Sequence, residues 1–205
     1  LLATLVAPLV LFSAHADGTD PLGDGYGYEF PALRDSFDPS LQMGLETALR
    51  RVGLSAPAKR GQLAVALVDI TEPESPRVAA VNGDQMIYAA SLPKIAILLG
   101  AFEEIERGRM SLDRQTWVDL REMIRVSSNS AATQMLNRVG KPTLANILRS
   151  PRYRLYDPEH NGGLWVGKDY AKQGVWRRDP LHNLSHGATA LQTARFYYLL
   201  DTTID

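Results

Sequence analysis

The 205-residue sequence contains no cysteine, so disulfide bonds are excluded as a source of stability. The fold must instead be held by core packing, and a hydrophobic content of 45% suits one globular domain or two small ones. The sequence also lacks an excess of either charge. With 22 basic and 23 acidic residues it has no basic surplus for nucleic acid phosphates, which favours a small or uncharged partner.

The apolar run at the start of the chain, residues 1–12, is too short to span a bilayer. Ala14-His15-Ala16 follows it as a small-x-small pattern, typical of a signal-peptide cleavage site. We therefore predict that residues 1–16 are part of an export signal and that no stable membrane span remains after its removal. The mature protein is expected in the periplasm or outside the cell. A buried helix or a short membrane anchor is the alternative, and the absence of an initial Met leads us to expect a missing beginning.

Residues 17–60 are expected to form an irregular arm and a first helix. The arm is rich in Gly, Asp and Pro and has little periodicity. Leucines at helical spacing then predict a helix over residues 39–52, with Asp38 as its N-cap and Gly53 as its stop.

Residues 61–90 are expected to contain the strands of a sheet. Three stretches, residues 62–71, 77–81 and 85–89, are dominated by apolar side chains, and the last two flank a tight turn or bulge at residues 82–84. From Ser91 the periodicity becomes helical, so residues 91–205 are predicted to form a mostly helical domain.

A serine and a lysine stand at the head of the apolar run over residues 89–102. Pro93 suits the first turn of a helix, and a spacing of three puts Lys94 on the same face as Ser91. Since the helix is apolar nearly all round, we expect it to be buried. A buried amine loses affinity for its proton, so Lys94 can accept the Ser91 proton and create a nucleophile. The alternative is an N-cap serine followed by a lysine that reaches the surface.

A second polar stretch, residues 127–130, lies between two predicted helices. Ser127 and Asn129 are two residues apart, so in an irregular turn their side chains can point the same way. The hydroxyl could then relay a proton, and the amide could hold a substrate amide. The alternative is that these residues only cap the helix that ends near Gly140.

Together the two motifs resemble those of the serine β-lactamase and penicillin-binding protein superfamily, most closely the class A β-lactamases. Ser91-Leu92-Pro93-Lys94 matches Ser-x-x-Lys and Ser127-Ser128-Asn129 matches Ser-Asp-Asn, within a similarity that runs from about residue 62 to residue 200. The resemblance implies an α/β (α+β) β-lactamase-like fold. In that fold an antiparallel sheet packed by helices adjoins a mostly helical domain, with the cleft between them.

The resemblance also implies an acyl-enzyme mechanism. Ser91 would attack an amide or β-lactam carbonyl, and Lys94 would act as the base or as part of the proton relay. Ser127 would pass the proton to the leaving nitrogen, while Asn129 would hold the side-chain amide of the substrate. No cofactor and no metal ion is implied.

Three departures from the family pattern are a shorter interval between the two motifs, a substitution in the second motif and the lack of a third motif. The interval from Ser91 to Ser127 is about two dozen residues shorter than in class A enzymes, so one wall of the cleft is expected to be absent. Ser128 replaces the aspartate that helps to brace the turn. The Lys-Thr/Ser-Gly motif does not occur in the sequence, so we expect the C-terminal strands to be missing and residues 17–205 alone to be inactive.

The fourth departure concerns hydrolysis of the acyl-enzyme, for which class A enzymes use Glu-x-x-Leu-Asn. Two near-duplicate stretches compete for this place, residues 157–161 and 179–183, each with Asp for Glu and His for Leu. We prefer Asp157 with Asn161 as a substrate-binding partner, and Asp179 is the alternative. Asp is one methylene shorter than Glu, and without a competent carboxylate the acyl-enzyme would persist, as in penicillin-binding proteins.

Two other patterns suggest different chemistry. Residues 162–169 spell most of a phosphate-binding loop, but Asp169 stands where Ser or Thr is needed. His182 and His186 are four residues apart, yet no Glu-x-x-His frame accompanies them, so surface or core positions are favoured over a zinc site.

The sequence thus predicts an exported, monomeric serine hydrolase that forms an acyl-enzyme with β-lactams or related amides. A D-Ala-D-Ala carboxypeptidase or another penicillin-binding amidase acting on peptidoglycan peptides is the alternative within the superfamily. A non-catalytic cell-envelope protein of the same fold is the alternative from another class.

Overall fold

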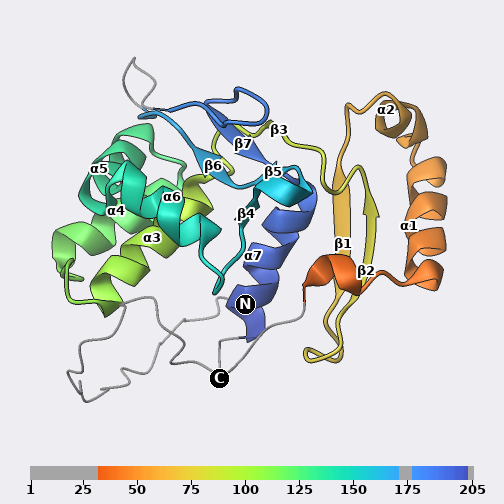
Figure 1. Cartoon of the computed structure of the whole chain (residues 1–205), viewed down its shortest axis with the longest axis horizontal. Coiled ribbons are helices and arrows are strands. Elements are labelled where there is room, and N and C mark those ends of the chain that lie inside the picture. The colour runs from red at the N-terminus through yellow and green to blue at the C-terminus, as the bar shows by residue number, and fades with distance from the viewer. Residues whose placement is uncertain (1–31, 171–176, 203–205) are drawn as a thin grey trace.

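The computed structural model describes residues 32–170 and 177–202 (Figure 1). The predicted signal, residues 1–16, and most of the predicted arm lie outside the described residues. The described part combines seven α-helices with small antiparallel sheets, which confirms the mixed α/β class.

The first helix begins where the sequence predicts. Helix α1 (Pro39–Arg51) is capped by Asp38, whose Oδ1 accepts a hydrogen bond from the backbone N–H of Leu41 at 2.7 Å. Gly53 follows its end with a φ of +74°, a left-handed conformation that glycine adopts without steric cost. A short helix, α2 (Ser55–Lys59), leads into the first strand.

Strands β1 (Val65–Asp69) and β2 (Arg77–Val81) lie within predicted strand ranges, and the structure pairs them antiparallel. Successive residues of β2 point to opposite faces of this sheet. Ala79 packs with Leu45 and Leu49 of α1, while Val78 packs on the other face with Leu191 and Tyr198 of α7 (Ala190–Thr202). The sheet therefore lies between α1 and α7, as Figure 1 shows on its right-hand side.

The third predicted strand is shorter than expected and belongs to another sheet. Strand β3 (Ile87–Tyr88) pairs with β7 (His186–Ala188), and β7 pairs in turn with β6 (Trp165–Val166). Asn82 has a φ of +54°, and the carbonyl of Gly83 accepts a hydrogen bond from the N–H of Leu191. The turn at residues 82–84 thus directs the chain away from β2, and it delivers β3 to a partner about a hundred residues later.

The remaining helices surround a second core. Helix α3 (Lys94–Glu106) contacts α4 (Arg114–Arg125), α5 (Asn129–Val139) and α6 (Lys141–Arg149). Gly100 allows close contact with α5, since a Cβ at this position would lie 2.9 Å from Cγ1 of Val139. The core includes Ile97, Met123 and Leu136. The expected burial of α3 holds for most of its length, but Phe102 is 43% exposed because the helix has one solvent-facing side.

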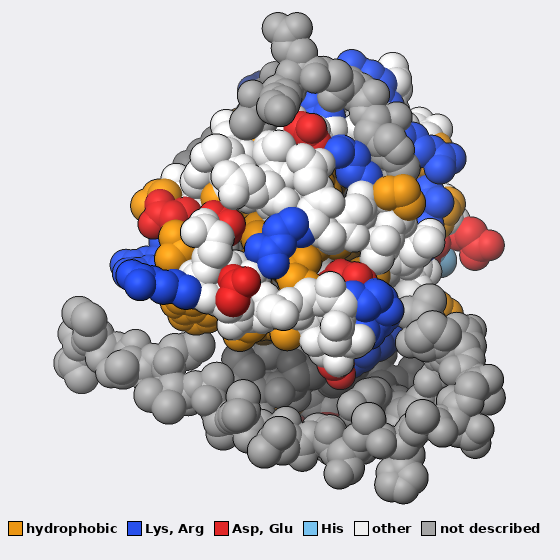
Figure 2. All heavy atoms as spheres, turned by 90° about the vertical axis from the view of Figure 1, so that its left-hand side faces the viewer, with side chains coloured by type: hydrophobic (Ala, Val, Ile, Leu, Met, Phe, Trp, Pro, Cys, Tyr) orange, Lys and Arg blue, Asp and Glu red, His pale blue; other side chains and the backbone are white. Residues whose placement is uncertain are grey.

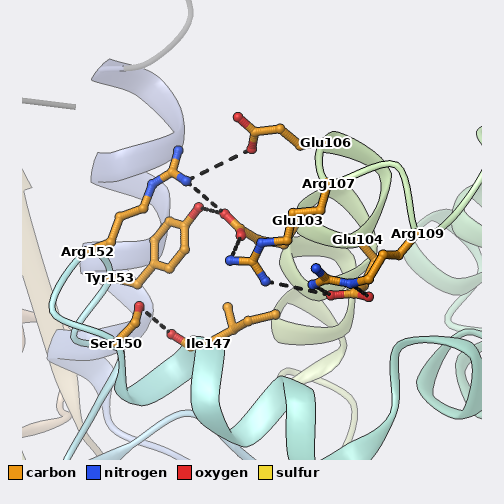
Figure 3. Close-up of polar contacts among 9 residues, drawn as sticks. All are labelled: Glu103, Glu104, Glu106, Arg107, Arg109, Ile147, Ser150, Arg152 and Tyr153. Atoms are coloured by element: carbon orange, nitrogen blue, oxygen red, sulfur yellow. Dashed lines mark hydrogen bonds and ion pairs between the residues drawn. The ribbon is translucent and has the colours of Figure 1, made fainter. Parts of the chain in front are cut away.

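The C-terminal end of α3 is fixed by an ionic network (Figure 3). Glu103 is 2% exposed and pairs with Arg107 at 2.5 Å and with Arg152 at 3.2 Å, and it also accepts a hydrogen bond from the hydroxyl of Tyr153. Arg109 pairs with the neighbouring Glu104 at 2.6 Å. The network therefore ties the C-terminal end of α3 to the segment after α6.

Four short strands also lie within the region expected to be mostly helical. Besides β6 and β7, strands β4 (Tyr156–Asp157) and β5 (Gly162–Gly163) form a two-stranded antiparallel pair. Short 3-10 turns occur at Leu33–Asp35 and Pro158–His160.

On the face formed by the helices around α3, basic and acidic side chains are interspersed (Figure 2).

Candidate active site

Ser91 lies in the turn that joins β3 to α3. Ala90, just before it, has a φ of +46°, a left-handed conformation that is costly for a residue with a side chain. The carbonyl of Ser91 accepts a hydrogen bond from the N–H of Lys94 at 3.1 Å, so the turn is already helical in its bonding. Ser91 itself is exposed, whereas Lys94 is 2% exposed. A strained turn therefore presents the serine at the head of a buried helix.

The amine of Lys94 is directed at the turn between α4 and α5. Its Nζ donates to the Ser127 carbonyl at 2.5 Å, to Ser127 Oγ at 2.9 Å and to Asn129 Oδ1 at 2.8 Å. Among the described residues no carboxylate pairs with this amine. Burial therefore acts without a compensating negative charge, and it lowers the pKa of Lys94.

Ser128, and not Ser127 or Asn129, caps helix α5. Its Oγ accepts a hydrogen bond from the N–H of Ala131 at 3.2 Å and lies 3.1 Å from Oγ of Ser130. Ser127 has a φ of +57°, which turns its side chain and that of Asn129 toward Lys94. Capping thus accounts for Ser128 only, and a serine fills the aspartate position of the motif because it too is a good N-cap.

Two residues near Lys94 were missed by sequence reasoning as members of this site. The ring of Tyr170 lies 4.8 Å from Lys94 Nζ, and it stacks on the imidazole of His186 with centroids 4.2 Å apart and an angle of 7° between the planes. Tyr170 follows β6, and His186 begins β7. No short-range pattern in the sequence links them to Lys94, because only the pairing of β3, β6 and β7 brings them together.

The two near-duplicate stretches fold as two similar turns. Asp157 accepts a hydrogen bond from the N–H of Glu159 at 3.0 Å, and Asp179 accepts one from the N–H of His182 at 2.5 Å. Each turn ends in an asparagine of left-handed conformation, Asn161 with a φ of +66° and Asn183 with a φ of +57°. The repeated Asp-Pro-x-His-Asn pattern is therefore explained by turn formation.

Both aspartates have further partners in these turns. Asp157 pairs with His160 at 2.6 Å, while the buried Asp179 accepts a hydrogen bond from the hydroxyl of Tyr156. Asn161 donates to the carbonyl of Asp84 at 2.7 Å. No hydrogen bond or ion pair joins any of the three to Lys94, Ser127 or Asn129 in the described part of the chain. Their roles in hydrolysis and substrate binding remain predictions.

Neither histidine of the i, i+4 pair belongs to a metal-binding group. Residues 32–170 and 177–202 contain no cluster of three or more metal-ligating side chains. His182 is exposed on its turn, whereas His186 is buried. Residues 162–169 form β5, β6 and the chain after them, and Asp169 pairs with Lys141 at 2.7 Å. Within the same ranges no helix has the length and apolar character that crossing a membrane requires.

Residues 44–119 match the model of the β-lactamase enzyme family. The matched range runs from α1 into α4, so it contains Ser91 and Lys94 and ends before Ser127. This finding supports the resemblance to the serine β-lactamase and penicillin-binding protein superfamily, and the mixed α/β architecture is consistent with that fold. No curated protein and no solved structure matches the chain.

Proposed function

Since the chain carries a β-lactamase family segment around Ser91 and Lys94, we propose that it is an exported serine hydrolase that forms an acyl-enzyme with β-lactams or related amides. Class A β-lactamases are the members whose motifs it most resembles. The observation that carries the proposal is the set of contacts of Lys94. A buried amine that pairs with no carboxylate among the described residues lies at hydrogen-bond distance from a serine hydroxyl and an asparagine amide, one helical turn after an exposed serine.

Acylation would use Ser91 as the nucleophile. Because burial lowers the pKa of Lys94, a larger fraction of this lysine is in the neutral amine form than for a lysine in water. The neutral amine accepts the Ser91 proton, directly or through Ser127, as Oγ of Ser91 bonds to the carbonyl carbon of the substrate. The positive end of the α3 helix dipole favours the negative charge that develops on the carbonyl oxygen.

The turn between α4 and α5 would complete the reaction. Ser127 passes the proton to the leaving nitrogen as the amide bond breaks. Asn129 uses its Oδ1 to accept from Lys94, which leaves its amide N–H groups for a carbonyl of the substrate. The same two side chains thus position the base and contact the substrate.

A D-Ala-D-Ala carboxypeptidase or other penicillin-binding amidase is the second candidate. The observation that favours it is the bonding of Asp157 and Asp179, both of which cap turns. A carboxylate occupied in this way is a poorer base for water, so the acyl-enzyme would survive longer. The substrate would then be a peptidoglycan peptide, and a β-lactam would act as an inhibitor.

The experiment is covalent labelling of the full-length gene product with a fluorescent penicillin. We expect label on Ser91, and no label in Ser91→Ala. Ser130→Ala is a matched control, since Ser130 is exposed. Among the described residues, its hydroxyl has a hydrogen bond only with the hydroxyl of Ser128. Label that survives Ser91→Ala would refute the assignment of the nucleophile. A folded wild-type protein that takes no label would instead indicate a non-catalytic envelope protein.

A further inference from the structure

Within residues 32–170 and 177–202, the buried polar atoms of two side chains near Lys94 have no hydrogen-bond partner. Neither nitrogen of His186 is bonded, although the residue is 2% exposed, and the buried hydroxyl of Tyr170 is unpartnered as well. A buried polar group without a hydrogen-bond partner is destabilising and calls for a functional or structural explanation. The stacked pair of rings adjoins the amine that the proposed reaction uses.

The strand pairing places His186 beside the segment that delivers Ser91. The carbonyl of His186 accepts a hydrogen bond from the N–H of Ala89 at 3.2 Å, two residues before Ser91. Directly paired residues of neighbouring strands project from the same face of a sheet. His186 therefore shares a face with its partner Val166 on β6 and with Ala89 across the ladder, and both of these pack against the core around α3.

The other candidate bases are committed elsewhere. Asp157 is bonded to His160 and to the N–H of Glu159, and Asp179 to Tyr156 and to the N–H of His182. Lys94 donates to three oxygen atoms. Within the described ranges, His186 is the basic side chain near Lys94 that retains an unused lone pair.

We propose that His186 is the proton acceptor for hydrolysis of the acyl-enzyme, an inference that rests on the function proposed above. The water oxygen bonds to the acyl carbon as His186 takes one water proton. The tetrahedral intermediate then collapses, the bond from the carbon to Oγ of Ser91 breaks, and the proton returns to Ser91. The products are a free carboxylic acid and the regenerated serine, so atoms and charge balance.

Burial and the neighbouring charges favour the neutral form of His186. Burial is the main cause that lowers its pKa to about 4, and the positive charges of Lys168 and Lys94 add to the effect. Tyr170 faces it with an uncharged ring, since burial raises the pKa of that phenol. A pKa of about 4 is close to that of an ordinary glutamate, the residue type that performs this task in the resembled enzymes, so it is no obstacle.

The test compares formation and loss of the penicillin label in the full-length protein. His186→Phe keeps a ring against Tyr170 but removes both nitrogens, and His182→Phe is the matched control on an exposed histidine. We expect His182→Phe to acquire label within about twofold of the wild-type rate, and loss of label is compared once each variant has been labelled. Loss of label should slow by about 100-fold or more in His186→Phe alone, the range of a general base.

The pH profile separates a proton acceptor from a packing residue. In the wild type, loss of label should slow as the pH falls through about 4, where His186 becomes protonated, and His186→Phe should lack that inflection. His186→Asn serves where the Phe variant does not fold. If His186→Phe or His186→Asn loses label at the wild-type rate, the inference is overturned. It is also overturned if loss of label slows in Asp157→Asn but not in His186→Phe. A wild type that never takes label contradicts the proposed function itself.

Discussion

Nζ of Lys94 lies 2.9 Å from Oγ of Ser127 and 33 residues separate the two in the chain. The pairing depends on two features of the backbone. The left-handed conformation of Ser127 turns its hydroxyl inward, and the cap supplied by Ser128 begins α5 one residue later. The Lys94 side chain is therefore held by the start of one helix and directed at the start of another.

Lys94→Met should separate chemistry from folding. The side chains are similar in length, and Lys94 is a buried amine that pairs with no carboxylate in the described part of the chain, so an apolar side chain suits the site. We expect labelling by fluorescent penicillin to be lost, while the circular-dichroism spectrum and the cooperative thermal transition remain. Loss of the folded spectrum in this variant would show that Lys94 is structural.

The sequence predicted the parts of the fold that depend on local chemistry. Asp38 caps α1, and strands β1 and β2 lie within the predicted ranges 62–71 and 77–81, because caps and strand-forming runs are encoded over a few residues. The partner of β3 was not predictable in this way. His186 lies about a hundred residues beyond Ile87, and only the global packing of α7 and β7 brings it close.

The same distinction applies to the candidate site. Ser91, Lys94, Ser127 and Asn129 stand in recognisable motifs, and the structure brings the last three into contact. Tyr170 carries no motif, and the polar Asp-Pro-x-His-Asn stretches resembled a catalytic loop because turn-forming residues are also the residues of active-site loops.

Ser128→Ala should destabilise the protein by about 0.5–2 kcal/mol, since it removes the N-cap of α5. Ser128→Asp should retain the stability, because an aspartate caps a helix equally well and its charge favours the N-terminus. Urea titration of both variants measures the difference. Equal loss of stability in the two would mean that the Ser128 side chain does not act as the cap.

Glu103→Ala should be among the most destabilising substitutions in α3. It leaves Arg107, Arg152 and Tyr153 without the buried carboxylate that joins them, and breaking a buried ion pair typically costs about 3–5 kcal/mol. Glu106→Ala is the matched control, because its side chain is 54% exposed and its ion pair with Arg152 is long, at 4.0 Å. The control should lie within about 0.5 kcal/mol of wild type in chemical denaturation.

Acid should weaken the β1–β2 pair through Asp69. The hydroxyl and N–H of Thr71, together with Arg77, hold the pKa of Asp69 at about 2, below the usual value of 3.8. A carboxyl whose pKa is depressed by folding stabilises the protein above the unfolded pKa, and that contribution disappears as the pH falls toward the folded pKa. We therefore expect part of the acid destabilisation between pH 4 and pH 2 to be absent in Asp69→Asn, measured as the pH dependence of the thermal midpoint. Since Asp69 and Arg77 lie at the surface, high salt should reduce the difference between the pH profiles of wild type and Asp69→Asn. Identical profiles of the two proteins at low salt would show that the β1–β2 pair does not depend on this carboxylate.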